Sequence, residues 1–480
     1  MLLALLLLAE AATPDAAARI IGGALSDNLA YQRLADLTET VGPRLSGSAG
    51  AEAAVRWGLA RFKEDGLAAH LEKVMVPHWV RGEERGEILA SDRMAGHPLS
   101  LTALGGSVGT PEGGVTAEVI EAQTLAGIAA LGEKARGKLI FLNHSMTTSK
   151  GYGEFVELRV FGPAAAARAG ARGVLLRSLA SASLRTPHTG VTIYDPGAPA
   201  APGAAISVED AELIHRLLAR GPVRARLVLG CRTLPDVESA NVVGEVRGRE
   251  KPGEVVLLGA HLDSWDLATG AIDDGAGVAI VMEAGRLIAH LPQAPRRTVR
   301  VVLYMNEENG SRGSKGYAEA HKGELDSHVA AMEADSGAGR PLALSVRAGE
   351  GGARAMKDWL APLETLGIGE ATEGGEGGAD IAPLGEARVP FASVQQDTTH
   401  YFDYHHSAAD TLDKVQPQAL ASNAAVFAWV AYALAEMPAP LPRPPPAAPR
   451  NRTAPPEAPS AATGSAPGGA SPPTTGGKPH

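Results

Sequence analysis

The sequence has little cysteine, few aromatic residues and little positive charge. Its 480 residues include a single cysteine, Cys231, and only 4% aromatic residues. One cysteine excludes an internal disulfide framework and a zinc site built from thiolates. We therefore expect Cys231 to be a small buried residue without a catalytic role.

Lysine and arginine number 44 against 54 acidic residues, so the formal net charge is −10. This balance disfavours nucleic acid or an anionic membrane surface as the main partner. Apolar residues make up 45% of the chain, and its length allows two domains with full cores plus a tail. The 14 histidines and many carboxylates leave ample material for a metal site without cysteine.

The two ends of the chain differ in composition from the rest. The apolar run from Leu2 to Leu8 precedes Ala9-Glu10-Ala11, a pattern typical of a signal peptide and too short to span a bilayer. We predict a signal peptide over residues 1–20, a secreted or periplasmic location and no membrane span. Residues 438–480 are rich in Pro, Ala and Gly and are predicted to form a disordered tail.

Between these ends, two patterns of secondary structure alternate. Residues 107–235 are predicted to form a separate unit of short strands and Ala-rich helices. Its strands are expected at Val115–Glu121, Lys138–Asn143 and Gly173–Arg177, and one helix at Val208–Arg220, with Ser207 as N-cap.

The remaining residues, 21–106 and 236–437, are predicted to form one discontinuous domain. Its strands Glu254–His261, Thr298–Asn306 and His328–Glu333 are mostly continuous apolar runs, with a helix at Gly277–His290. Continuous apolar runs are typical of strands covered on both faces, so we expect a three-layer α/β sheet.

Polar residues that can bind metal follow three of these strands. His261 and Asp263 come at the end of the first, the pair Glu307-Glu308 after the second, and Asp335 after the third. In open α/β sheets, functional residues gather at the carboxyl ends of strands. Each group alone has an ordinary explanation as a solvated strand exit.

Two further groups belong to the same pattern. The pair Asp273-Asp274 precedes a Gly-rich helix start, where helix capping could account for one of the two carboxylates. Far downstream, His405-His406 precede Ser407, and Asp410 follows shortly after. Histidine and carboxylate without cysteine suit zinc with nitrogen and oxygen ligands.

Taken in order, these motifs resemble the co-catalytic two-zinc exopeptidases, which include the bacterial leucyl aminopeptidase type and glutamate carboxypeptidase. The segments Val76–Gly82, Thr186–Gly190 and His261–Asp266 are similar to the carboxypeptidase Q branch, and the match runs from Ile21 to Glu436. The resemblance implies a phosphorylase/hydrolase-like α/β domain with an inserted protease-associated domain, two Zn²⁺ ions and a homodimer.

The resemblance also implies a role for each site residue. His261 and Asp335 would bind one zinc, Glu308 and His406 the other, and Asp273 would bridge them. It further implies a cis peptide bond at Asp273–Asp274.

Two residues would act without binding metal: Glu307 would be the general base, and Asp263 would orient His261. His405 and Glu333 are weaker rivals of His406 and Asp335.

Three alternatives remain open at this stage. An aminopeptidase would use the same metals as a carboxypeptidase or dipeptidase, and the motifs do not locate the groups that hold a free peptide end. A glutaminyl cyclase-like acyl transferase and a non-catalytic receptor-like protein also occur on this fold. The complete set of ligands and the base favours a zinc-dependent exopeptidase acting on small peptides or dipeptides.

Overall fold

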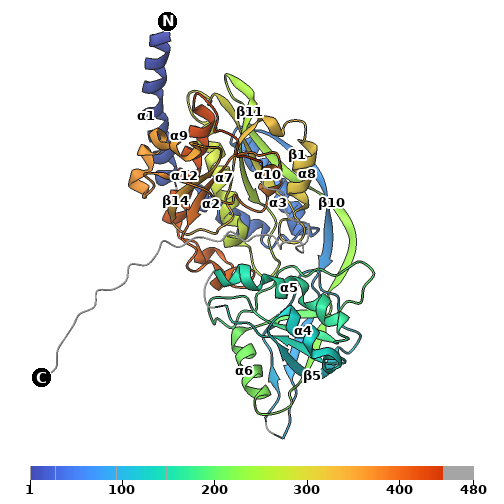
Figure 1. Cartoon of the computed structure of the whole chain (residues 1–480). Coiled ribbons are helices and arrows are strands. Elements are labelled where there is room, and N and C mark those ends of the chain that lie inside the picture. The colour runs from blue at the N-terminus through green and yellow to red at the C-terminus, as the bar shows by residue number, and fades with distance from the viewer. Residues whose placement is uncertain (1, 28, 93, 147–149, 447–480) are drawn as a thin grey trace, which may run out of the picture.

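The computed structural model describes residues 2–27, 29–92, 94–146 and 150–446, which form two eight-stranded sheets. Figure 1 shows the two parts one above the other, with the N-terminal helix on the upper part and α4, α5 and α6 on the lower.

The first sheet carries parallel strands at its centre. β12 and β13 flank β11 in parallel, and β16 runs parallel to β13. The carboxyl ends of these strands therefore share one edge. In spatial order the strands are β1 (Ala68–Val80), β10 (Arg232–Val246), β12 (Arg297–Tyr304), β11 (Lys251–His261), β13 (His328–Glu333), β16 (Phe391–Gln396), β14 (Pro341–Arg347) and β15 (Ala371–Glu373).

Helices cover both faces of this sheet. One face packs against α3 (Ala49–Glu64), α7 (Ala276–Ala289) and α12 (Pro417–Glu436), and the other against α8 (Arg312–Ala320) and α10 (Ala382–Glu386). Every residue of β12 is buried, including Arg297 and Arg300, which pair with Glu254 and Glu245. The predicted three-layer α/β fold is confirmed. The short helices α2 (Leu29–Asp36), α9 (Gly352–Ala355) and α11 (Tyr401–Tyr404) complete this part.

The N-terminal helix, α1 (Leu2–Asp27), joins this core before residue 20. Ala16, Ala17 and Ile20 are buried and belong to the same apolar cluster as α7 and α12. A leader ending at residue 20 would remove these contacts, so the folded part begins earlier than predicted. An end at Ala11 would leave all three in place.

Helix α12 bears on the prediction that the chain has no membrane span. Among the described helices, it alone is long and apolar enough to cross a bilayer. However, 83% of its apolar window is buried inside the protein. Core packing accounts for this apolar composition.

The second sheet takes in strands that the sequence analysis placed in the first domain. Residues 84–103 form β2, β3 and β4, which pair with β9 and β8, so this unit begins well before residue 107. The order is β3 (His97–Pro98), β2 (Glu84–Ile88), β9 (Arg224–Leu229), β5 (Val115–Ala122), β6 (Leu139–Leu142), β7 (Gly173–Arg177), β8 (Gly203–Ile206) and β4 (Leu101–Ala103). We call residues 84–229 the second unit.

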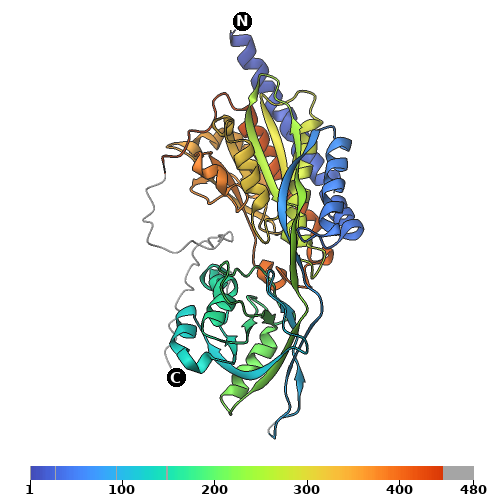
Figure 2. The same cartoon turned by 90° about the vertical axis from the view of Figure 1, so that its right-hand side faces the viewer.

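Three helices accompany the second sheet: α4 (Leu125–Leu131), α5 (Lys150–Arg168) and α6 (Val208–Leu218). Ser207 accepts a hydrogen bond from the Asp210 amide, so the predicted N-cap of α6 is confirmed. Long antiparallel strands β1 and β10 lead from the first sheet toward this unit, as Figure 2 shows.

The predicted tail boundary at 438 is too early. Leu441 is buried, and the guanidinium of Arg443 donates hydrogen bonds to the carbonyls of Ala387, Leu325 and His328. These contacts bind the segment to the first domain. The rest of the predicted tail, residues 447–480, lies outside the described residues.

Candidate metal centre

The shared edge of the parallel strands brings the predicted ligands together. His261 is the last residue of β11, Glu308 follows β12, and Asp335 follows β13. Asp273 lies on the buried turn Ala271–Gly275 before α7, and His406 follows α11. Residues from five separate segments thus meet at one edge.

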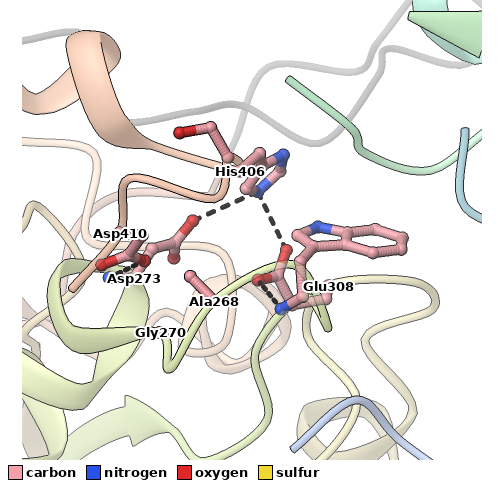
Figure 3. Close-up of a pocket in the computed structure, with 8 residues that line it drawn as sticks. Ala268, Gly270, Asp273, Glu308, His406 and Asp410 are labelled. Atoms are coloured by element: carbon pink, nitrogen blue, oxygen red, sulfur yellow. Dashed lines mark hydrogen bonds and ion pairs between the residues drawn. The ribbon is translucent and has the colours of Figure 1, made fainter. Parts of the chain in front are cut away.

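Asp273 stands at the centre of this group. Its Oδ1 lies 3.1 Å from His261 Nε2, and Asp335 Oδ1 is 3.8 Å from the same nitrogen. Its Oδ2 lies 3.1 Å from His406 Nε2, which is 2.9 Å from Glu308 Oε2 (Figure 3). One carboxylate therefore faces two histidine–carboxylate pairs, as a bridging ligand must.

His405 also lies near Asp273, with Nε2 3.5 Å from Oδ2. Its ring stacks on that of His406 at 3.5 Å between centroids. Among the described contacts, His406 alone of the two reaches both Asp273 and Glu308. This geometry favours His406 as the ligand.

Glu333 is engaged by backbone amides. Its carboxylate accepts hydrogen bonds from the amides of Asp380 and Ile381, and holds the turn before α10. Asp335, two residues later, lies beside His261 instead. The structure thus gives Glu333 a structural role and favours Asp335 at the site.

Asp263 holds two strand ends in place. Its Oδ1 accepts hydrogen bonds from the amides of Asn306, at 2.7 Å, and Glu307, at 3.0 Å. The ring Nδ1 of His261 lies 3.0 Å from the backbone oxygen of Asp263 and 3.9 Å from its carboxylate. Asp263 therefore orients His261 chiefly through its carbonyl, while its carboxylate fixes the Glu307 backbone.

Two further carboxylates support the turn that carries Asp273, and one of them is the helix cap that the sequence analysis allowed for. Asp274 accepts hydrogen bonds from the amides of His261 and Gly277, and so caps α7. Asp410 accepts hydrogen bonds from the amides of Ile272, at 2.6 Å, and Asp273, at 3.2 Å. The peptide bond Asp273–Asp274 is cis, as predicted.

Buried arginine Arg44 is another residue that sequence reasoning missed. Its guanidinium donates hydrogen bonds to the backbone oxygens of Leu262, Thr269 and Gly270. These bonds join the loop after β11 to the turn before Asp273. The sequence around Arg44 indicates a Gly- and Pro-containing turn but no contact with these residues.

Several carboxylates at the site are buried close together, and their pKa values are raised. Burial, followed by the charges of neighbours such as Asp273, raises the pKa of Glu308 to about 7 and that of Asp335 to about 6. Burial also raises the pKa of Glu307 well above its usual range, with Asp335 and Glu308 adding to the effect. Such crowding of buried acids requires positive charge nearby.

A divalent metal fits this set of donors. Asp273 Oδ2 is buried without a hydrogen-bond donor, although it faces two imidazoles. The residues offer imidazole nitrogen and carboxylate oxygen, with no thiolate within the set. This combination suits zinc, and cations would relieve the repulsion between the carboxylates.

The second unit takes part in holding His406. The amide of Thr189 donates a hydrogen bond to the His406 carbonyl at 2.8 Å. His406 Nδ1 lies 3.3 Å from the Thr189 carbonyl. An imidazole that binds metal through Nε2 donates from Nδ1, so this contact sets the required tautomer.

Comparisons with known proteins agree with this geometry. Residues 241–431 match the family model "Peptidase family M28". Carboxypeptidase Q of Mus musculus is 41% identical over 418 residues, covering 87% of both chains. The chain belongs to peptidase family M28.

Solved structures extend the comparison to the whole fold. A Peptidase M28 precursor from Shewanella amazonensis has a TM-score of 0.85 at 42% identity, covering 89% of this chain and 98% of that one. A zinc aminopeptidase from Bacillus subtilis has a TM-score of 0.61 at 21% identity, covering 84% and 93%. The latter likeness concerns the fold alone.

Proposed function

We propose that this M28 member is a zinc-dependent exopeptidase that hydrolyses small peptides or dipeptides, with two Zn²⁺ per chain. The observation that carries the proposal is the position of Asp273, whose two oxygens each face a histidine that has a second carboxylate beside it. The relatives named carboxypeptidase Q support the activity.

In this proposal His261 and Asp335 hold one zinc, Glu308 and His406 hold the other, and Asp273 bridges them. Bound there, the metals would lower the pKa of a water molecule and polarise the scissile carbonyl. The separation of two histidine–carboxylate pairs around one aspartate supports a count of two.

Glu307 would move the proton. It follows Asn306 at the strand end, where hydrogen bonds from both residues' amides to Asp263 fix its backbone. Its carboxylate would accept a proton from the attacking water and deliver it to the leaving amine. Burial, and then the neighbouring carboxylates, raise the pKa of Glu307. Bound metals would lower this pKa toward neutral pH, where a carboxylate can both accept and release a proton.

A second candidate is an aminopeptidase that uses the same metals. Its support is the relative named aminopeptidase from Bacillus subtilis, 24% identical over 325 residues. The carboxypeptidase reading rests on the greater identity of the carboxypeptidase Q relatives over most of the chain.

The test combines metal analysis with a set of blocked substrates. The purified chain should contain two zinc ions, and a chelator should abolish hydrolysis of a free dipeptide. The same peptide is then supplied with an acetylated amine or an amidated carboxylate. Cleavage of the acetylated form supports a carboxypeptidase, cleavage of the amide alone an aminopeptidase, and absence of zinc and turnover a receptor-like protein.

Three further proposals come from the sequence. The Leu2–Leu8 run and the following Ala9-Glu10-Ala11 support export to the periplasm or medium, which cell fractionation would test. The resemblance supports a homodimer, measurable by analytical ultracentrifugation. It also supports identification of the second unit as a protease-associated domain.

A further inference from the structure

Arg159, on α5 of the second unit, is buried without an acidic partner. It is 5% exposed, and no carboxylate of the described residues lies within ion-pair distance of its guanidinium. Arg33 and Arg297, which are also buried, each pair with Asp or Glu, and buried Arg44 donates hydrogen bonds to three backbone oxygens. Burying a charge costs several kcal/mol unless it is paired or hydrogen-bonded, and Arg159 has neither an ion pair nor the set of acceptors that Arg44 has.

The hydrogen-bonding capacity of Arg159 is mostly unused. Its Nη1 donates to the Tyr152 hydroxyl at 2.7 Å, and its Nε is buried with no partner. A guanidinium carries five N–H groups in a planar fork that matches a carboxylate.

Arg159 also stands beside the metal centre. Its Nη1 lies 3.4 Å from His406 Nδ1. If His406 binds metal through Nε2, its Nδ1 carries a hydrogen and donates to the Thr189 carbonyl. In that state both Arg159 Nη1 and His406 Nδ1 carry hydrogens, so His406 is not an acceptor for Arg159.

Gly190 leaves room for this guanidinium. A Cβ at Gly190 would lie 2.3 Å from Arg159 Cζ, and the backbone φ of +137° further favours glycine. Two residues earlier, both ring nitrogens of His188 are buried without a partner. The second unit therefore holds several unsatisfied polar groups next to the metal ligand His406.

We propose that Arg159 binds the C-terminal carboxylate of the peptide substrate. This inference rests on the proposed exopeptidase function and names the peptide end that the site reads. A bidentate pair with a carboxylate would satisfy guanidinium N–H groups that have no acceptor and would supply a counter-charge for Arg159. The second unit would thus determine specificity, while the first domain supplies the metal ligands.

The experiment compares alanyl-alanine with its C-terminal amide as substrates of the zinc-loaded full chain. The wild type should prefer the free acid. Arg159→Met should lower kcat/KM for the acid about 100-fold, as expected for loss of a hydrogen-bonded charge pair, and leave the amide within about threefold. Its zinc content should not change.

Two further variants keep the test decisive if Arg159→Met folds poorly. Gly190→Ala should displace the guanidinium and reduce the same acid-to-amide ratio. Arg168→Ala, on the exposed end of the same helix and paired with Asp195, is the matched control and should leave the ratio unchanged.

Equal cleavage of acid and amide by the wild type, or an equal loss of both in Arg159→Met, would overturn the inference. In either case chelator-sensitive hydrolysis by the wild type would leave the proposed function standing. A wild type without such hydrolysis would overturn both.

Discussion

Adjacent residues Glu307 and Glu308 have different surroundings, which suit them to different roles. Glu308 accepts a hydrogen bond from the Trp265 amide and lies 2.9 Å from His406 Nε2. Glu307 has its backbone fixed by Asp263, and no hydrogen bond to its side chain is present among the described residues. The first arrangement suits a fixed ligand, and the second a carboxylate that exchanges protons with water.

Glu307→Gln should therefore separate metal binding from catalysis. The amide keeps the shape of the side chain but does not accept a proton as a base. We expect kcat to fall roughly 10²- to 10⁴-fold, the range typical of general acid–base catalysis. Zinc content, measured by elemental analysis, should remain that of the wild type.

Glu319→Gln, on the exposed side of α8, is the control and should retain full activity. Retained turnover in Glu307→Gln would remove Glu307 from the mechanism, and loss of zinc would instead make it a ligand.

Asp410 acts on Asp273 through the backbone. Both of its oxygens accept amide hydrogen bonds from the turn, and Asp410→Asn leaves only one oxygen to do so. We expect zinc affinity to fall about 10- to 100-fold, as for other residues that orient ligands. Competition with a fluorescent chelator measures this change.

The matched control is Asp413→Asn, because that carboxylate is exposed and contacts only Thr411 and Lys414. Unchanged affinity in Asp410→Asn would show that the turn holds its shape without these bonds.

Residues that offer side chains at strand ends could be predicted from the sequence. His261, Glu308 and Asp335 each follow an apolar run, and parallel strands place such residues at one edge. Arg44 and Asp410 could not be found in this way. They act on backbone atoms of segments far along the chain, and backbone groups leave no pattern in the sequence.

At the scale of elements, β13 and α8 are joined by a buried polar network. The Tyr317 hydroxyl lies 2.8 Å from His328 Nε2 and accepts a hydrogen bond from Arg300. Burial, reinforced by the positive charge of Arg300, lowers the pKa of His328 to about 4. His328 therefore stays neutral in the folded protein at pH values where the unfolded chain takes up a proton.

Because of this network, we expect the free energy of unfolding to depend on pH between about 4 and 6.5. Between pH 6.5 and about 4 the unfolded chain binds one more proton at His328, so the free energy of unfolding falls as the pH falls. The slope from this group approaches about 1.4 kcal/mol per pH unit. His328→Gln should flatten the dependence, as measured by urea unfolding at pH 7 and pH 4.5.

His290→Gln is the control, since the ring of His290 is exposed at the end of α7. If His328→Gln and the wild type lose equal stability on acidification, the network does not set this dependence.

Elements with strong periodicity were predictable, and those defined by long-range pairing were not. The strands Gly173–Arg177 and His328–Glu333 have the predicted bounds. Strands β2, β3 and β4 have at most five residues each, and only the pairing of β2 with β9, β3 with β2 and β4 with β8 assigns them to the second unit. Likewise, the burial of Ile20 depends on α7 and α12, more than 200 residues downstream.

At the scale of the whole molecule, one loop of the first domain reaches into the core of the second unit. Trp265 follows Asp263 in the loop after β11, yet its ring belongs to the apolar core of the second unit. There it covers Gly105, where any Cβ would overlap the ring. The next residue, Asp266, pairs at 2.9 Å with Arg81, whose guanidinium also donates hydrogen bonds to Glu84 and to the Ala103 carbonyl of the second unit. The loop that follows His261, a proposed metal ligand, is thus anchored in the other unit.

This anchor should make the two units unfold together. In calorimetry we expect one cooperative transition for the metal-free wild type, because unfolding of either unit exposes Trp265 and breaks the Arg81–Asp266 pair. Trp265→Ala removes a ring that is worth about 3–5 kcal/mol when buried. The second unit should then unfold at a lower temperature than the first domain, and the calorimetric trace should split into two transitions.

Trp57→Ala is the matched control, because Trp57 is a buried tryptophan of the first core that does not contact the second unit's cluster. It should lower the Tm without splitting the transition. A single transition in Trp265→Ala would mean that the β1–β10 ribbon suffices to couple the units. Two transitions would show that the loop carrying Asp263 couples the second unit to the metal centre. The hydrogen bond from Thr189 to His406 is a second such connection.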